Sequence, residues 1–173
     1  MLRAERCLHF DQRLFEKWQS KVKLAGGSVD RLAASLGKKE EALAQLEKTY
    51  QTVVNTKDSF WGVAALYQLG NASEQLADEM SEPPEIQGAA KADVVKELAP
   101  RIKQMKERAL KFYASGHDII TKFDVYNEWS VKLITGILRM KGEKLTFDDW
   151  IIAPDFLGAE IPSGMISSLR GER

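Results

Sequence analysis

The stretch DSFWGVAALYQLGNASEQLADEM, residues 58–80, carries the clearest structural signal in the sequence. Its apolar side chains recur every three or four residues, which is the period of one face of an α-helix. They are Trp61, Ala65, Leu69, Ala72 and Leu76. Asp58 or Ser59 can cap this helix, because a short polar side chain accepts a hydrogen bond from a free amide at the helix start. The proline pair at 83–84 cannot continue the helix, so we predict a helix over 58–81.

The same spacing predicts two helices on the N-terminal side of this stretch, over residues 4–20 and 29–55. The segment LAGGSVD separates them with helix-breaking glycines, and Ser28 or Asp30 can cap the second helix. Gly37 weakens the middle of that helix by about 1 kcal/mol relative to alanine. Its apolar stripe consists of Leu43, Leu46, Tyr50 and Val53.

Two more helices are predicted on the C-terminal side, over residues 89–123 and 128–140. Pro100 is expected to divide or kink the first, because proline removes an amide donor and clashes one turn back. Asn127 can cap the second helix, and Gly142 can end it. The stripe after the proline consists of Ile102, Met105, Ala109, Phe112, Gly116, Ile119 and Phe123.

The composition is that of an ordinary globular domain, with 173 residues, 44% of them apolar and 29% charged. No apolar run approaches the roughly 18 residues of a membrane span, and the zero formal charge argues against a dedicated nucleic-acid binder. The single cysteine, Cys7, excludes an intrachain disulfide. The opening MLRAERCLHF has neither the long apolar stretch of a secretion signal nor a helix cap, so we expect it to lie inside a longer protein.

The helices over 58–81 and 89–123 carry small and aromatic residues at regular spacings. They are Leu66, Leu69 and Gly70 in the first, and Ala109, Tyr113 and Gly116 in the second. This is the pattern of a tetratricopeptide repeat, in which Leu-Gly allows two antiparallel helices to pack closely. The chain then reads as helix pairs 4–55 and 58–123 with a final helix over 128–140. We therefore predict an all-α fold, a right-handed stack of enlarged tetratricopeptide-like helix pairs with an extended C-terminal segment.

A more specific resemblance rests on four short motifs. They are Phe60-Trp61, AALYQLG at 64–70, the proline pair at 83–84 and VYNEW at 125–129. Over about residues 4–140 the chain resembles the tetratricopeptide-type proteins associated with gliding motility and the cell envelope in predatory and gliding δ-proteobacteria. The resemblance implies a protein-binding scaffold in the periplasm or at the outer membrane, with the cytoplasm as the alternative. Apart from its proline pair, the loop SEPPEIQGAAKADVV departs from the family's pattern, and nothing after about Gly142 matches it.

In the register of the repeat, the concave face of the stack receives four residues that lie off the main apolar stripe of their helix. They are Tyr67, Asn71, Glu74 and Gln75. We interpret them as candidate partner-binding residues, the simpler interpretation being a solvated helix face. Four other aromatic residues fall at packing positions and are expected in the core. They are Tyr50, Trp61, Tyr113 and Trp129.

The residues capable of chemistry do not form a recognisable catalytic site. Cys7, His9 and Asp11 would lie on different faces of a helix, and His117 and Asp118 are adjacent in sequence. The sequence contains neither a glycine-rich phosphate loop nor a metal-ligand cluster. We therefore expect a non-enzymatic protein with no catalytic residues, no metal and no cofactor.

The segment after the last predicted helix, residues 143–173, includes the apolar stretch FDDWIIAPDFL. Its large apolar side chains are too many to leave in water, and its prolines and glycines disfavour a long helix. We expect an extended tail docked on the helices, where it either caps the stack or meets a partner through Phe147, Trp150 and Phe156. The tail has six acidic and three basic side chains, whereas residues 1–57 have seven and eleven, which favours contact within or between chains.

Together these patterns predict a protein–protein interaction scaffold within a larger bacterial assembly, the envelope or motility machinery by resemblance. One alternative is a self-associating structural domain, a homo-oligomer in which the C-terminal tail swaps between chains. Another is an adaptor that binds a small signalling protein in a groove lined by Tyr67, Asn71 and Gln75. Neither a nucleic-acid partner nor membrane insertion is expected.

Overall fold

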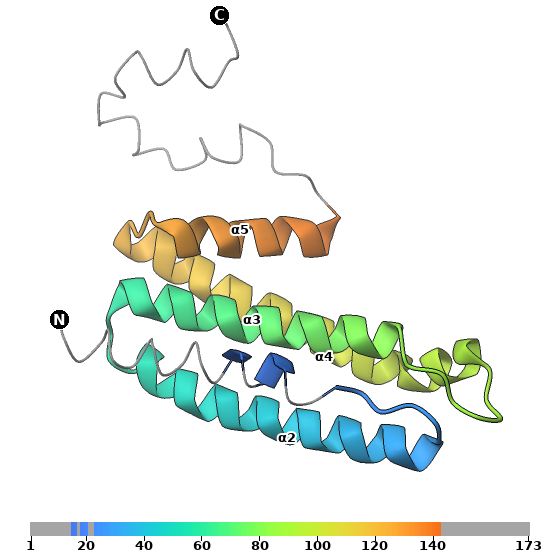
Figure 1. The fold of residues 1–173 in the computed structure, drawn as a ribbon. Coiled ribbons are helices and arrows are strands. Elements are labelled where there is room, and N and C mark those ends of the chain that lie inside the picture. The colour runs from blue at the N-terminus through green and yellow to red at the C-terminus, as the bar shows by residue number, and fades with distance from the viewer. Residues whose placement is uncertain (1–14, 17, 21–22, 143–173) are drawn as a thin grey trace, which may run out of the picture. The chain divides into compact units, whose positions relative to one another are not determined.

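The computed structural model describes residues 15–16, 18–20 and 23–142, all within the first of two units, Met1–Glu143 and Lys144–Arg173. Its helices are α2 (Val29–Val54), α3 (Ser59–Ser81), α4 (Lys91–Phe123) and α5 (Glu128–Lys141), shown in Figure 1. Residues 15–16 and 18–20 are also helical, and we call them the N-terminal segment. The described residues contain no β-strand, only an isolated bridge between Gly27 and Ile86. The predicted all-α class is therefore confirmed.

Three helices begin at capping residues that the sequence predicts. Ser28 caps α2, Asp58 caps α3 and Asn127 caps α5, and each side chain accepts a hydrogen bond from a backbone amide in the first turn. α5 ends at Gly142, whose φ of 74° lies in the left-handed region that favours glycine. These local signals explain why the predicted helix boundaries agree closely with the structure.

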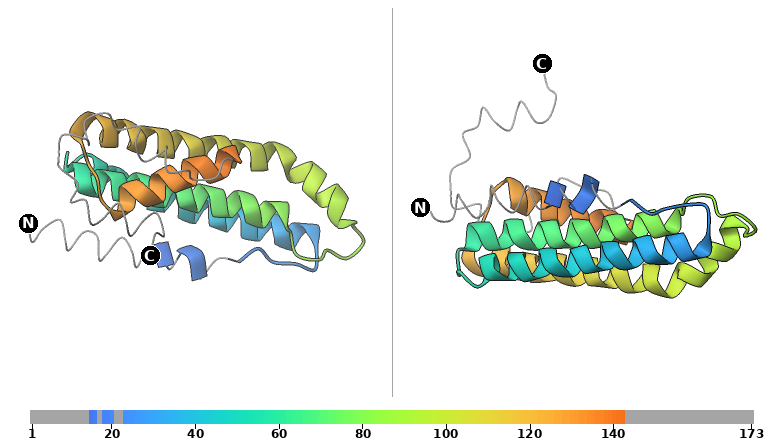
Figure 2. Two further views of the ribbon diagram at one scale, coloured as in Figure 1. Left: turned by 90° about the horizontal axis from the view of Figure 1, so that it is seen from above. Right: turned by 60° about the horizontal axis from the view of Figure 1, so that its bottom comes forward.

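α4 differs from its prediction at its start and at Pro100. It begins at Lys91 rather than at residue 89, because Gly88 has a φ of 78° and closes a turn before the helix. The helix continues through Pro100 to its end, so the proline does not divide it. Pro100 is exposed, and the carbonyl that loses its hydrogen bond can therefore reach water. The left view of Figure 2 shows α4 bending in its first part.

α3 is the central helix of the described part of the chain. It packs against α2, α4 and α5, and the two aromatic side chains of the N-terminal segment join α2 and α3 in one cluster. The ion pairs Glu40–Arg101 and Glu47–Arg108 link α2 to α4, which shows that these two helices run parallel. α5 packs on both α4 and α3. Helices that are adjacent in sequence therefore pack together, and so do helices that are two apart.

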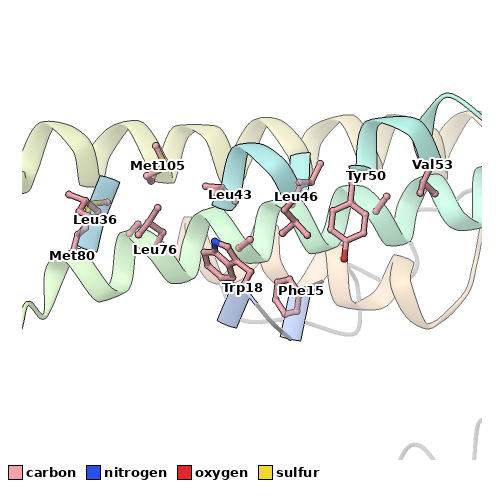
Figure 3. Packing of buried hydrophobic residues seen from close by; sticks show 14 residues of the cluster. Phe15, Trp18, Leu36, Leu43, Leu46, Tyr50, Val53, Leu76, Met80 and Met105 are labelled. Carbon is pink, nitrogen blue, oxygen red and sulfur yellow. The ribbon is translucent and has the colours of Figure 1, made fainter. Parts of the chain in front are cut away.

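The larger hydrophobic cluster lies between the N-terminal segment, α2, α3 and α4. Figure 3 shows Phe15 and Trp18 lying against these helices. Beneath them Lys39 is fully buried, with its ammonium group paired to Glu79 and 4.9 Å from the centre of the Trp18 ring. The predicted apolar stripes of α2 and α3 form most of this cluster, as expected.

A second cluster lies between α3, α4 and α5 around Tyr113, which is fully buried. A Cβ atom at Gly70 of α3 would lie 2.3 Å from Cε1 of this ring, and one at Gly136 of α5 would lie 2.9 Å from Cζ. Only a residue without a side chain allows α3 and α5 to approach the ring so closely. The expectation that Gly70 permits close helix packing is confirmed.

Most of the aromatic predictions agree with the structure. Tyr50 and Tyr113 are buried, and Trp61 and Trp129 are half-buried against the two clusters. Phe123 is an exception, because its side chain is 57% exposed at the last residue of α4. There α4 has reached the beginning of α3, so no further residues of α3 cover it.

Candidate functional site

A polar hollow opens on α3 beside the last turn of α5. It has a volume of about 450 Å³ and is lined by Asn71, Glu74, Gln75 and Asp78 of α3, Lys106 of α4, and Arg139 and Met140 of α5. α5 runs in the same direction as α3, as Figure 1 shows. It is the shorter helix, with 14 residues against 23 in α3. α3 therefore continues for about two turns beyond Glu74, the residue that pairs with Arg139. The hollow lies where α3 extends past the end of α5, and we call it the polar hollow.

Glu74 connects three helices beneath the polar hollow, and only 9% of its surface is exposed. Arg139 donates from Nε to Oε1 at 2.8 Å and from Nη2 to Oε2 at 2.7 Å. The hydroxyl of Tyr113 donates to Oε2 of Glu74 at 2.8 Å. Paired two-point hydrogen bonds of this kind fix orientation as well as adding stability. Glu74 therefore holds α5 and α4 to α3, and its charge is compensated within the fold.

Two partners of Glu74 have raised pKa values, Tyr113 and Arg139. Burial and the charge on Glu74 raise the pKa of Tyr113 far above its ordinary value of 10.0, so its hydroxyl remains a donor. The hydrogen bond to Glu74 raises the pKa of Arg139 above its ordinary, already high value. Both groups therefore keep their protons at physiological pH.

Asp78 and Lys106 are exposed side chains at the rim of the polar hollow. Partial burial, followed by the charge on Glu74, raises the pKa of Asp78 above its ordinary value of 3.8, while Lys106 and Arg139 oppose this rise. The lining contains two acidic and two basic side chains, so its formal charge is zero. The polar hollow therefore offers hydrogen bonds and paired charges without a strong preference for either sign.

The side chains of the lining are carboxamides, carboxylates, a lysine, an arginine and a methionine. None of its residues is a serine, cysteine or histidine, the usual nucleophiles and bases of covalent catalysis. Across the described ranges, no cluster of three or more His, Cys, Asp or Glu residues is placed to hold a metal ion. In those same ranges, no helix combines the length and apolar character needed to cross a membrane.

In comparisons with known proteins, the chain matches no family model, no curated protein and no solved structure. The resemblance to envelope and motility proteins of the tetratricopeptide type therefore stays a prediction from sequence.

The structure brings three of the four residues predicted on α3 into the polar hollow. Asn71 and Gln75 are half-buried in its lining, and Glu74 lies beneath it in the ion pair with Arg139. Tyr67 instead packs in the second cluster, with its ring centre 6.2 Å from that of Tyr113 and 5.9 Å from that of Trp129. Phe147, Trp150 and Phe156, the candidate contacts in the tail, lie outside the described residues, as do Cys7, His9 and Asp11.

Sequence reasoning did not identify Asp78, Lys106, Arg139 and Met140 as lining residues. Asp78 could have been found, because it lies one turn beyond Glu74 on the same face of α3. For Lys106 and Arg139 the sequence holds no such signal. Their places depend on how far α4 and α5 are shifted along α3, which helical periodicity does not specify.

Proposed function

We propose that this protein is a non-enzymatic protein–protein interaction scaffold that binds its partner at the polar hollow. Exposed donors, acceptors and compensated charges are the groups that polar protein contacts use. The observation that carries the proposal is the position of Asn71 and Gln75. Repeat register alone selects these residues as binding candidates, and both line the polar hollow.

We propose further that the helices form a right-handed, tetratricopeptide-like stack. The order of packing supports this, because a stack of helix hairpins places each helix against both the next and the second next. In such a stack the N-terminal segment, α3 and α5 would form one layer, and α2 and α4 the other. The polar hollow would then lie on the first layer, where the repeat register places the concave binding face. The assignment to envelope or motility machinery rests on the sequence resemblance.

Site-specific crosslinking tests whether the polar hollow contacts a partner. A photoreactive amino acid replaces Asp78, an exposed residue of the lining, in the full chain, and the matched control carries it at Gln104, an exposed residue of α4 outside the lining. After irradiation in the source cells, the Asp78 variant should form an adduct with one defined protein that the Gln104 variant does not form. Equal adducts from both positions, or none from residue 78, would contradict binding at the polar hollow.

A further inference from the structure

Three amide side chains form a hydrogen-bonded row from the N-terminal segment to the polar hollow. Nε2 of Gln19 donates to Oε1 of Gln75 at 3.1 Å, and Nε2 of Gln75 donates to Oδ1 of Asn71 at 3.3 Å. Among the hydrogen bonds between described residues, neither N–H of Asn71 is used and one N–H of Gln75 is left over. The row therefore presents donors and acceptors together on one surface.

The spacing of Asn71 and Gln75 suits an extended peptide. Residues four apart on a helix are separated by about 6 Å along its axis. In an extended chain, backbone groups that face the same way recur every two residues, about 6.6–6.8 Å apart. Every non-proline residue of a peptide carries one N–H donor and one C=O acceptor, and a carboxamide side chain can pair with both. Two successive carboxamides on α3 can therefore follow the backbone of one peptide.

The charges around the row disfavour a strongly charged ligand. Lys106 and Arg139 would attract an anion, but Glu74 and Asp78 would repel it. A cation would be attracted by the two acidic side chains and repelled by the two basic ones. Arg139 is already paired with Glu74, which leaves less of its charge to attract an anion. The polar lining is also unlike a typical small-molecule pocket, although its volume of about 450 Å³ is sufficient for one.

We propose that the polar hollow binds an extended, uncharged peptide segment of the partner, and that Asn71 and Gln75 hydrogen-bond to its backbone. This proposal takes the location of binding from the proposed function and adds the chemical class of the ligand. Recognition through the backbone makes the site tolerant of side-chain sequence while requiring free N–H and C=O groups. A folded partner surface lacks such free backbone groups, and a strongly charged peptide of either sign would meet like charges in the lining.

Selection from a phage-displayed library of random linear peptides against the full chain tests the proposal. The variant N71A/Q75A lacks both carboxamides, and its matched control Q45A/Q104A lacks two exposed glutamines outside the polar hollow. Enriched peptides should carry little net charge, and they should bind N71A/Q75A at least about tenfold more weakly than wild type, as expected for two lost hydrogen bonds. Binding to Q45A/Q104A should equal binding to wild type.

N-methylation of alternate backbone amides in an enriched peptide separates backbone recognition from side-chain recognition. Methylation in one register removes the N–H groups that face α3 and should abolish binding, whereas methylation in the other register should have a smaller effect. Enriched peptides of one charge sign, equal loss in both registers, unchanged binding to N71A/Q75A or no enrichment at all would overturn the proposal. If the crosslink from residue 78 to a partner still forms in any of those cases, the proposed function stands and only the ligand class is wrong.

Discussion

Replacing Gly70 by alanine tests the packing that places α3 against Tyr113. The new Cβ would lie 2.3 Å from Cε1, 2.5 Å from Cδ1 and 2.8 Å from Cζ of the ring, closer than atoms in contact can approach. The ring cannot simply retreat, because Gly136 of α5 already lies against Cζ, Cε2 and the hydroxyl oxygen. A shift of α3, α4 or α5 is therefore required.

Two opposing effects decide the magnitude for Gly70→Ala. Alanine favours a helix interior over glycine by up to about 1 kcal/mol, whereas overpacking a core costs about 1–3 kcal/mol. Because the ring is confined from two helices, we expect the upper part of that range and a net destabilisation of about 1–2 kcal/mol. In a chain of this size, that lowers the melting temperature by about 2–8 °C.

Gly37→Ala is the matched control, because Gly37 is exposed in α2 and no atom lies within 4 Å of a Cβ built there. Only the helix propensity changes, so the variant should be more stable than wild type by about 0.5–1 kcal/mol. Urea unfolding of both variants, followed by far-ultraviolet circular dichroism, measures the difference. A Gly70 variant as stable as the Gly37 variant would refute the packing around Tyr113.

Three further predictions follow from Glu74, Asp78 and the tail. Glu74→Ala removes the acceptor of the buried Tyr113 hydroxyl and should lower the free energy of unfolding by about 1–3 kcal/mol. The exposed control Glu41→Ala should change it by less than about 0.5 kcal/mol. Equal effects of the two substitutions would contradict the hydrogen-bond network around Glu74. Because the pKa of Asp78 is raised, its ionisation opposes folding, so Asp78→Asn should raise the melting temperature at neutral pH. That gain should vanish below the ordinary pKa of 3.8, where Asp78 is protonated whether folded or unfolded, and a gain independent of pH would contradict the assigned cause. The sequence predicts that backbone amides in residues 147–157 are protected from hydrogen exchange. Protection only at high protein concentration would favour swapping of the tail between chains. Fast exchange at every concentration would contradict docking of the tail on the helices.

Local chemistry made most of the fold predictable. Helix starts are fixed by the residue that accepts a hydrogen bond from the first turn, so Ser28, Asp58 and Asn127 could be recognised individually. Pro100 shows where such reasoning stops, because a proline removes one hydrogen bond and can bend a helix without ending it. On the exposed side of α4 the carbonyl that loses this bond can reach water, and a continuous helix results.

The candidate site was only half predictable, for a physical reason. Asn71, Glu74 and Gln75 share one helix, and their common face follows from the helical period. Whether a residue on that face meets solvent depends on its neighbours on other helices. Trp129 covers Tyr67, and Arg139 engages Glu74, although both of these residues lie more than sixty positions away in the sequence.

The most direct test of binding at the polar hollow is a nuclear magnetic resonance titration of the ¹⁵N-labelled full chain with a peptide enriched from the phage-displayed library. The side-chain NH₂ signals of Asn71 and Gln75, assigned from their alanine variants, report on the carboxamides themselves. We predict that these signals shift as the peptide is added, while those of Gln45 and Gln104 stay in place. Saturated binding that leaves the Asn71 and Gln75 signals unmoved would contradict the polar hollow as the binding site.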